Sequence, residues 1–297
     1  MKVQELWVDK GNFRNTRAVE SRLPEPGDGQ IRVAIDKFAI TSNNVGYAFS
    51  GDMIGYWKFF PTGEAPWGKV TVWGMADVVE SNSPDIDVGE RLYGFFPMSS
   101  HVVLTPGRIK DAFFMDVAPH RQELPALYNQ YSRTRAEPAE LQAIEEARCV
   151  FFPLFATGFV IADFLADNEW FGAAQVLIGS VSSKTGNGLA KFVKSNGYEG
   201  KLVGLTSDRN RAFVEDIGLC DEVVTYDNVK GLDNVPSVYI DMSGDGPLRA
   251  RLHHHLGENM KNSQIVGVTH WEAVPANEPL PGSQRVFFFA PTQIDKR

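Results

Sequence analysis

The chain has 297 residues, of which 43% are hydrophobic, so it is long and apolar enough for two domains with buried cores. It carries 29 Lys and Arg against 37 Asp and Glu, a net charge of −8, which argues against a nucleic-acid-binding or anionic-membrane surface. Residues 1–10 show no basic-then-apolar leader, and no uninterrupted apolar run is long enough to cross a bilayer, so we expect a cytoplasmic protein.

Short strands broken by Gly and Pro dominate the chain up to about residue 104. They are expected at residues 30–35, 69–80, 91–96 and 101–104. This pattern predicts a small antiparallel, barrel-like β domain.

Helical spacing replaces this pattern after about residue 130. Glu and Ala recur over residues 136–147 and predict an exposed helix, and Pro153 is expected to open a more apolar helix that ends at Leu165. Cys149 and Cys220 lie far apart in the sequence. Two distant cysteines indicate a reducing compartment rather than a disulfide-built domain.

Residues 175–190 (QVLIGSVSSKTGNGLA) run from an apolar strand through a loop of small residues into a helix. Such a helix start presents free N–H groups and a partial positive charge, which favours a pyrophosphate. A plain strand-turn-helix without a ligand is the alternative.

The rest of a nucleotide-binding unit follows. Further strands are expected at residues 201–205, 221–226, 238–241 and 264–268, with helices at 209–217 and 247–256. Alternating strands and helices predict an α/β fold with a doubly wound parallel sheet. Its ligand would lie beyond the carboxyl ends of the strands, at residues 179–185, 206–209, 242–244 and 269–271.

The loop after the first of these strands matches neither common phosphate motif literally. A P-loop needs a Gly before the Lys-Ser/Thr pair, where this chain has Ser183, and the glycines of a G-x-G-x-x-G fingerprint arrive late. Small residues and hydroxyls still fill the turn. The expected cofactor contacts are Gly179, Ser180, Ser182, Ser183, Lys184, Thr185 and Gly186, with Ser243 and Thr269 at later strand ends.

The end of the second strand indicates which dinucleotide would bind. An NAD-selective site places an acid there, whereas this chain has Thr206 and Ser207, with Arg209 and Arg211 just after. Hydroxyls and arginines suit a ribose 2′-phosphate and favour NADPH over NADH. The alternative is that both arginines are solvated residues of a surface helix.

A β domain followed by a Rossmann-type domain resembles the medium-chain dehydrogenase/reductase superfamily, in its zinc-independent, quinone-reductase-like branch. Residues 23–33 (LPEPGDGQIRV) and 85–94 (DIDVGERLYG) look like two of its segments. Four further segments resemble an uncharacterised domain-of-unknown-function family within it: residues 56–61 (YWKFFP), 67–74 (WGKVTVWG), 153–159 (PLFATGF) and 182–185 (SSKT).

The resemblance implies a GroES-like β-barrel domain at residues 1–130 and a Rossmann domain at 131–290. Members normally return to the β domain afterwards, so residues 291–297 would begin a return segment that is cut short. The positions matching zinc ligands hold Thr41, Asn44 and Trp73, which cannot rebuild a zinc site, so no metal is expected.

The histidines do not suggest a metal site. His253, His254 and His255 are consecutive, and adjacent helical residues point about 100° apart, so a polar helix end is expected instead. His101, His120 and His270 are isolated, and a structural or surface place is expected for each.

Without zinc, a reductase needs a held nicotinamide, a polarised acceptor and a proton donor. The resemblance implies that residues 41–44 face the nicotinamide, which makes Tyr47 the first candidate donor, with Tyr56, Tyr128 and Tyr131 behind it and Asn44 as a polar partner. Each Tyr is alternatively a half-buried core residue. Four aromatic residues are expected either to line an acceptor pocket or to form core: Trp57, Phe59, Phe60 and Trp73.

Two functions remain open. One is an NADPH-dependent, zinc-independent oxidoreductase acting on a small-molecule quinone, enone or related conjugated carbonyl. The other is a catalytically inactive dinucleotide-binding protein that acts as a sensor or interaction module. A homodimer is common in the superfamily.

Overall fold

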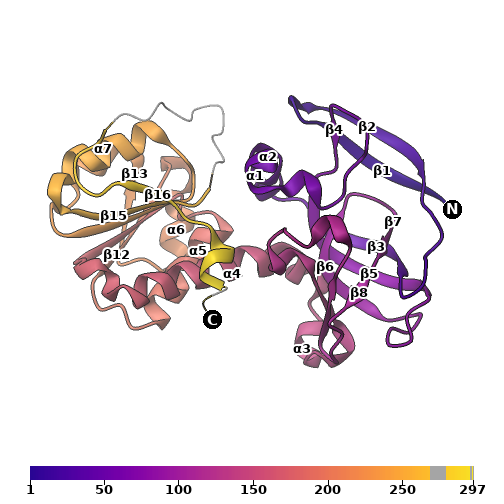
Figure 1. The fold of residues 1–297 in the computed structure, drawn as a ribbon. Helices are drawn as coiled ribbons and strands as arrows, with labels where there is room; N and C mark the ends of the chain where they lie inside the picture. Colours follow the sequence, from indigo (N-terminus) through magenta and orange to yellow (C-terminus); the bar gives the residue numbers. More distant parts are fainter. Residues whose placement is uncertain (268–278, 295, 297) are drawn as a thin grey trace. The chain divides into compact units, whose positions relative to one another are not determined.

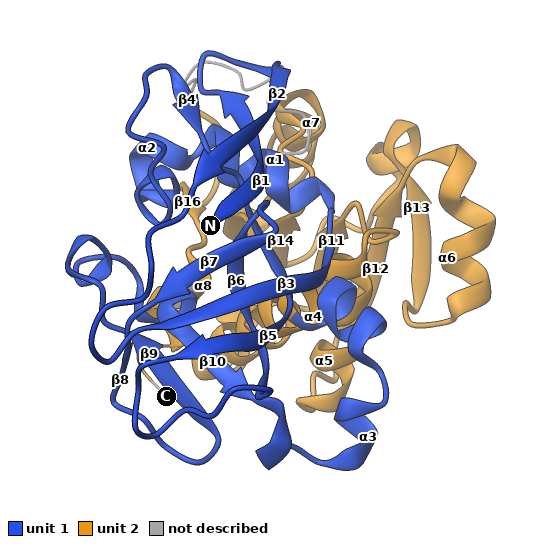
Figure 2. Cartoon of the chain, turned by 90° about the vertical axis from the view of Figure 1, so that its right-hand side faces the viewer, with its two compact units in different colours: residues 1–152 blue, residues 153–297 orange. Residues whose placement is uncertain are grey.

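Antiparallel strands form the first of the two units into which the chain divides, Met1–Phe152 and Pro153–Arg297 (Figure 1, Figure 2). The computed structural model describes residues 1–267, 279–294 and 296. The expected domain boundary at residue 130 lies inside the first unit, because β10 (Gln130–Arg133) pairs with β6 (Arg91–Pro97) and β9 (Phe113–Asp116).

The first unit contains two sheets. A seven-stranded sheet, ordered β7-β3-β5-β6-β10-β9-β8, forms a nearly closed barrel, and a three-stranded sheet has the order β2-β1-β4. The remaining bounds are β1 (Lys2–Asp9), β2 (Asn12–Arg22), β3 (Ile31–Ala39), β4 (Trp67–Gly68), β5 (Thr71–Ser81), β7 (His101–Leu104) and β8 (Pro106–Gly107). The predicted strands correspond to β3, β5, β6 and β7.

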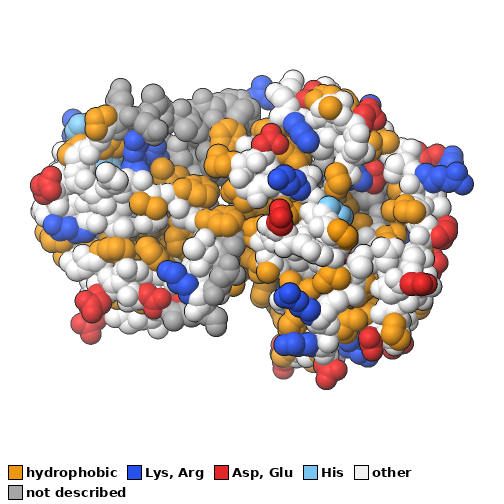
Figure 3. Space-filling view, viewed as in Figure 1, with side chains coloured by type: hydrophobic (Ala, Val, Ile, Leu, Met, Phe, Trp, Pro, Cys, Tyr) orange, Lys and Arg blue, Asp and Glu red, His pale blue; other side chains and the backbone are white. Residues whose placement is uncertain are grey.

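Apolar side chains from facing strands fill the barrel. Ile31, Val72 and Phe95 are fully buried there, and Tyr131 from β10 joins the same core. Burial alternates along β7 and β9, as in strands with one solvent-facing side, whereas β6 is buried continuously from Leu92 to Pro97. On the face drawn in Figure 3, basic and acidic side chains are interspersed.

The first unit also contains short helices. They are α1 (Ser42–Phe49), α2 (Gly51–Ile54) and α3 (Ala139–Gln142), with 3-10 turns η1 (Tyr56–Lys58), η2 (Pro119–Arg121), η3 (Ala126–Asn129) and η4 (Thr134–Ala136). The single exposed helix predicted over residues 136–147 is wrong. Pro138 lies at the N-cap of α3, so the segment breaks into η4, α3 and the start of α4.

Helix α4 (Glu145–Asp167) begins in the first unit and continues into the second. Pro153 lies inside it rather than at its start, which corrects the prediction. By length and composition α4 could cross a membrane, although Asp163 interrupts its apolar run. Core helices of water-soluble proteins pass the same test, and this property alone does not indicate a membrane span.

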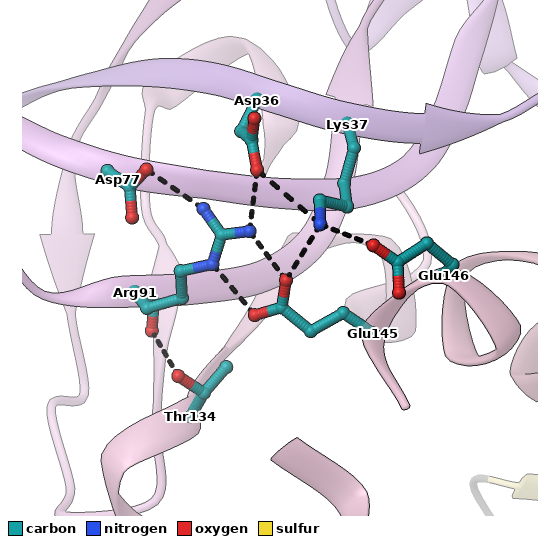
Figure 4. Close-up of polar contacts among 7 residues, drawn as sticks. All are labelled: Asp36, Lys37, Asp77, Arg91, Thr134, Glu145 and Glu146. Atoms are coloured by element: carbon teal, nitrogen blue, oxygen red, sulfur yellow. Dashed lines mark hydrogen bonds and ion pairs between the residues drawn. The ribbon is translucent and has the colours of Figure 1, made fainter. Parts of the chain in front are cut away.

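An ion-pair network holds the first turn of α4 to the barrel (Figure 4). Arg91 on β6 donates to Glu145 at 2.8 and 2.7 Å, to Asp77 at 2.8 Å and to Asp36 at 2.7 Å. Lys37 on β3 lies 3.3 Å from Glu145. The Arg91 guanidinium lowers the pKa of Glu145 to about 2. The network therefore fixes the first turn of α4 against β3, β5 and β6.

The second unit is built on six parallel strands in the order β13-β12-β11-β14-β15-β16. They are β11 (Gln175–Gly179), β12 (Lys201–Thr206), β13 (Glu222–Thr225), β14 (Ser237–Asp241), β15 (Met260–Ile265) and β16 (Arg285–Phe287). This is the order of a dinucleotide-binding sheet: successive strands are added on one side from β11 to β13 and on the other side from β14 to β16, so the strand order reverses between β11 and β14. The predicted α/β, doubly wound fold class is confirmed.

Helices cover both faces of this sheet. Side chains of α4, α5 (Lys184–Ser195) and α6 (Arg211–Ile217) share one core with Val176 and Ile178. Those of α7 (Gly246–Leu256) and η7 (Tyr226–Gly231) share another core with Leu177 and Tyr239. The remaining elements are η5 (Glu169–Gly172), η6 (Asp208–Asn210), η8 (Gly257–Asn259) and α8 (Ala290–Ile294). Gly218 ends α6 with a φ of 68°, as predicted.

Candidate functional site

The turn after β11 is held by its own backbone. Ser180 adopts a φ of 52°, Val181 N–H donates to Leu205 O at 3.1 Å and Ser183 N–H donates to Ser180 O at 2.9 Å. The chain thus turns sharply at the carboxyl edge of the sheet and enters α5 directly.

Ser183 caps α5. Its Oγ accepts a hydrogen bond from Gly186 N–H at 3.1 Å. A Cβ at Gly186 would lie 2.9 Å from Ser180 O and 2.8 Å from Val181 Cα, so only glycine allows the helix to start this close to the turn. Lys184 is exposed and Thr185 is half-buried in the first turn. The remaining first-turn amides and the helix dipole form an anion-binding arrangement.

The end of β12 lies against this turn. Asn210 donates to Ser182 Oγ at 3.2 Å, which ties the start of α6 to the start of α5. Thr206 is fully buried, and its hydroxyl has no hydrogen-bond partner among the described residues. A buried hydroxyl without a partner is costly, so this atom is suited to a bound water or ligand group.

Ser207 and the two arginines differ in their surroundings. Ser207 is half-buried at the start of η6, and Arg209 is exposed with no ion pair among the described residues. Arg211 donates to Glu215 at 2.8 Å, one helical turn away. Arg209 is therefore the better placed cation for a ribose phosphate, and Arg211 has the surroundings of a surface helix residue.

Tyr226, which the sequence reasoning missed, also reaches the turn. Burial raises the pKa of its phenol, and a side-chain hydrogen bond with Ser180 opposes that rise. A Tyr directly after the third strand was the available signal. Tyr226 therefore joins the candidate cofactor contacts.

Ser243 and Thr269 were the expected cofactor contacts at later strand ends. The Ser243 side chain is 2% exposed, its Oγ donates to Asp241 at 3.0 Å, and it accepts from Asp245 N–H at 3.2 Å. These bonds commit the hydroxyl to the fold of its own loop. Thr269 and His270 lie outside the described residues.

In the first unit, Tyr47 is half-buried on α1. Trp73 Nε1–H donates to its hydroxyl oxygen at 3.4 Å. Burial raises the pKa of Tyr47, and side-chain hydrogen bonds with Trp73 and Asn43 partly offset that rise. The phenol therefore keeps its proton at neutral pH, with the Trp73 indole N–H donating to its oxygen.

Asn44, expected in the catalytic site, makes structural hydrogen bonds instead. Its Oδ1 accepts from Thr41 N–H at 2.6 Å, its Nδ2 donates to Thr71 O at 2.8 Å, and the residue is 7% exposed. Both ends of the amide thus hold the start of α1 against β5. Asn44 positions α1 and has no free group to offer a substrate.

The other tyrosines are bonded within the barrel. Tyr56 and Tyr128 share a hydrogen bond of 2.7 Å between their hydroxyls, and burial raises the pKa of both. Tyr131 is fully buried and donates to Phe95 O at 2.7 Å, and burial raises its pKa to about 12. Tyr131 is a core residue in this structure, not an accessible proton donor.

The structure also distinguishes core from partly exposed positions for the four aromatic residues and for His253. Trp57, Phe59 and Phe60 are core, whereas Trp73 is half-buried and stacks on Tyr93 at 5.7 Å. Buried His253 contacts Pro281 O at 2.9 Å and Ser263 Oγ at 3.0 Å, so it is not a polar helix end.

The other histidines differ in exposure, and both cysteines are unbridged. His254 is exposed, and His255 contacts Leu232 O at 2.8 Å. His101 contacts Ser100 Oγ at 3.1 Å, and His120 contacts Phe59 O at 3.2 Å.

Both cysteines, Cys149 and Cys220, are free. Within the described residues no group of three or more His, Cys, Asp or Glu could hold a metal ion.

Residues 38–297 match the family described as "Protein of unknown function (DUF2855)", and the chain belongs to this family. No curated protein sequence matches the chain.

Solved structures share its fold at low identity. The quinone oxidoreductase from Coxiella burnetii is 14% identical with a TM-score of 0.56, and the match covers 100% of this chain and 87% of that one. CurA in complex with NADPH from Vibrio vulnificus is 13% identical with a TM-score of 0.59, over 97% and 82% of the two chains. A mutant enoyl thioester reductase from Candida tropicalis is 12% identical with a TM-score of 0.54, over 99% and 84%. At these identities the likeness shows the fold alone, and this is the fold that the resemblance to the medium-chain dehydrogenase/reductase superfamily implied.

Proposed function

We propose that the protein is an oxidoreductase that uses NADPH, without zinc, to reduce a quinone, an enone or a related conjugated carbonyl. The observation that carries the proposal is the start of α5, where Ser182, Ser183 and exposed Lys184 surround free helix amides beside the end of β12. This arrangement suits the pyrophosphate of a dinucleotide.

The residues present fit the cofactor. The α5 amides and Lys184 would hold the pyrophosphate, and Ser207, Arg209 and Tyr226 would hold the ribose 2′-phosphate. A nicotinamide bound at this edge would supply a hydride. The unpartnered Thr206 hydroxyl supports a ligand or an ordered water at the same place.

Tyr47 is the proposed proton donor. Trp73 donates to its oxygen, so its own O–H proton is left to donate to the acceptor oxygen. As that oxygen gains negative charge, the phenol stabilises it and transfers the proton. The structural neighbours include a quinone oxidoreductase and an enoyl thioester reductase, which supports this reaction class. Cytoplasmic location and a homodimer belong to the same proposal.

A catalytically inactive dinucleotide-binding protein is the second candidate. The side chains of Asn44 and Tyr131 are fully used in hydrogen bonds within the barrel unit. Tyr47 is therefore the best placed proton donor among the candidate catalytic residues. A site that depends on one phenol loses turnover easily. Such a protein would bind NADPH and reduce no acceptor.

The test is a titration of intrinsic tryptophan fluorescence with NADPH and with NADH. We expect tighter binding of NADPH, and Arg209→Ala should bring NADPH affinity close to that for NADH while leaving NADH unchanged. Arg211→Ala, whose guanidinium is already paired with Glu215, is the matched control. Equal affinities in the wild type would contradict NADPH selectivity.

Turnover is then measured as NADPH oxidation against a panel of quinones and enones. Reduction of a member of the panel supports the oxidoreductase. Binding of NADPH without any turnover supports the inactive alternative.

A further inference from the structure

Asp241, at the end of β14, connects three segments at the carboxyl edge of the second unit's sheet. Its side chain is fully buried. Oδ1 accepts from Ser243 N–H at 3.0 Å, from Ser243 Oγ–H at 3.0 Å and from Gly244 N–H at 2.9 Å. The loop of residues 242–245, here called the β14 loop, is thus folded around one carboxylate oxygen.

Arg249 on α7 holds the other oxygen. Its Nη1–H donates to Asp241 Oδ2 at 2.7 Å, and the Arg249 side chain is 4% exposed. A buried carboxylate without a cation would be costly, so this contact lets the charge stay at the edge of the sheet. Only one guanidinium nitrogen is used on Asp241.

The backbone of Asp241 binds the segment that follows β15. Its carbonyl accepts from Val266 N–H at 2.9 Å and from Gly267 N–H at 3.3 Å. A Cβ at Gly267 would lie 2.0 Å from Met242 O, so the two segments touch through backbone and only glycine fits. The position of residues 266–267 therefore depends on the β14 loop.

These segments lie where the second half of a dinucleotide is bound. Asp241 is the register partner of Gly179, the last residue of β11, across the β11–β14 pair. In this strand order β11, β12 and β13 form one mononucleotide-binding half, and β14, β15 and β16 form the other. The phosphate turn and the ribose-selecting residues belong to the first half, so the β14 loop belongs to the nicotinamide half.

We infer that Arg249 and Asp241 are positioning residues for the nicotinamide half of the cofactor. The inference rests on the proposed function. The ion pair sets the β14 loop and the 266–267 segment, while the first half of the site is built by separate residues. Disrupting the Arg249–Asp241 ion pair should then lower the affinity for NADPH more than the affinity for a ligand that occupies only the adenosine half of the site.

The experiment compares NADPH with 2′,5′-ADP, which carries the adenosine half alone, as binding ligands of Arg249→Met. We expect NADPH affinity to fall about tenfold to a hundredfold, the loss that corresponds to one or two hydrogen bonds to the displaced loop. Affinity for 2′,5′-ADP, which is bound by separate residues, should change less than about threefold. A purely structural role would lower both affinities together, through the folded fraction, which circular dichroism measures in parallel.

Two further variants and a control sharpen the result. Arg249→Lys should recover most of the NADPH affinity, because a single N–H contact reaches Asp241. The double variant Asp241→Asn/Arg249→Met should also bind NADPH better than Arg249→Met, since an amide oxygen accepts the same loop N–H bonds without a buried charge. His254→Gln, on the exposed side of α7, should change neither affinity.

The outcomes separate the inference from the proposed function. A wild-type protein that binds neither ligand overturns the proposed function. A wild type that binds both, with Arg249→Met weakening both equally or neither, overturns the positioning role alone. No recovery in either rescue variant would contradict the role of the buried charge.

Discussion

Replacing Arg121 with Met should cost the first unit about 3 to 5 kcal/mol of unfolding free energy, the range for breaking a buried ion pair from one side. Arg121 is 1% exposed and is hydrogen-bonded and ion-paired to Asp116. It also donates to Tyr131 Oη at 3.2 Å and to Tyr128 O at 3.2 Å, and it stacks 4.6 Å above the Phe60 ring.

The magnitude follows from what the substitution leaves behind. Met replaces most of the apolar contact with Phe60, so the main loss is electrostatic. The Asp116 carboxylate, whose side chain is 2% exposed, would remain buried with only the N–H groups of Ala118 at 2.9 Å and Thr105 at 3.3 Å. A buried charge left this way accounts for most of the expected loss.

The assay is denaturant unfolding followed by tryptophan fluorescence. Four of the six tryptophans, Trp7, Trp57, Trp67 and Trp73, lie in the first unit, so the signal reports mainly on it. Arg108→Met, at an exposed position, is the control and should stay within about 0.5 kcal/mol of the wild type.

A double variant, Asp116→Asn/Arg121→Met, tests the stated cause. It removes the buried charge together with its partner, so it should be less destabilised than Arg121→Met alone by about 1 to 3 kcal/mol. A single variant that loses less than about 1 kcal/mol, or a double variant that loses as much as the single, would refute the reasoning.

Other expectations concern the site and the ion-pair network. Lys184→Ala should weaken both NADPH and NADH by up to about 2 kcal/mol in a fluorescence titration, with Lys191→Ala as the exposed control on the same helix; no change would place Lys184 in solvent. Tyr47→Phe should lower turnover by about 10² to 10⁴ at nearly unchanged NADPH affinity, and full activity would assign the proton to another group. The Glu145 pKa is lowered to about 2, so its contribution to stability is present above its unfolded pKa and is lost as pH falls toward that value. Glu145→Gln should therefore lose less stability than the wild type between about pH 5 and pH 2, and parallel curves would contradict this. Elemental analysis should find no stoichiometric zinc, and one zinc per chain would overturn the zinc-free site.

The second unit was predictable because its signals are local. Each buried parallel strand is an apolar run followed by a turn, and the helices between them carry their own caps, such as Ser183 and Gly218. The phosphate turn needs only consecutive residues, so its place could be predicted from one stretch of sequence. The four-residue error at the start of β15 (Met260–Ile265) arose because Asn262 and Ser263 are polar yet buried in the strand.

The first unit was less predictable because its contacts are distant in sequence. Strand β2 is mostly exposed and pairs with β1 alone among the described strands, so it lacks an apolar pattern. Arg121 is charged yet nearly fully buried, because Asp116 and Tyr131 surround it. Whether a particular Tyr is core or exposed depends on such partners, and for that reason Tyr131 and Tyr47 could not be distinguished from sequence.

The three positions that the resemblance equates with zinc ligands now contribute to the surroundings of one phenol. Thr41 and Asn44 hold the start of α1 through reciprocal backbone and side-chain bonds of 3.1 and 2.6 Å, and α1 carries Tyr47. Trp73, from the neighbouring β5, donates its indole N–H to the Tyr47 oxygen. A metal would polarise an acceptor oxygen through its charge, whereas a phenol does so by hydrogen bonding and can also deliver a proton. Substitutions at Thr41, Asn44 or Trp73 should therefore affect the protein through the placement and proton affinity of Tyr47 rather than through the loss of a ligand.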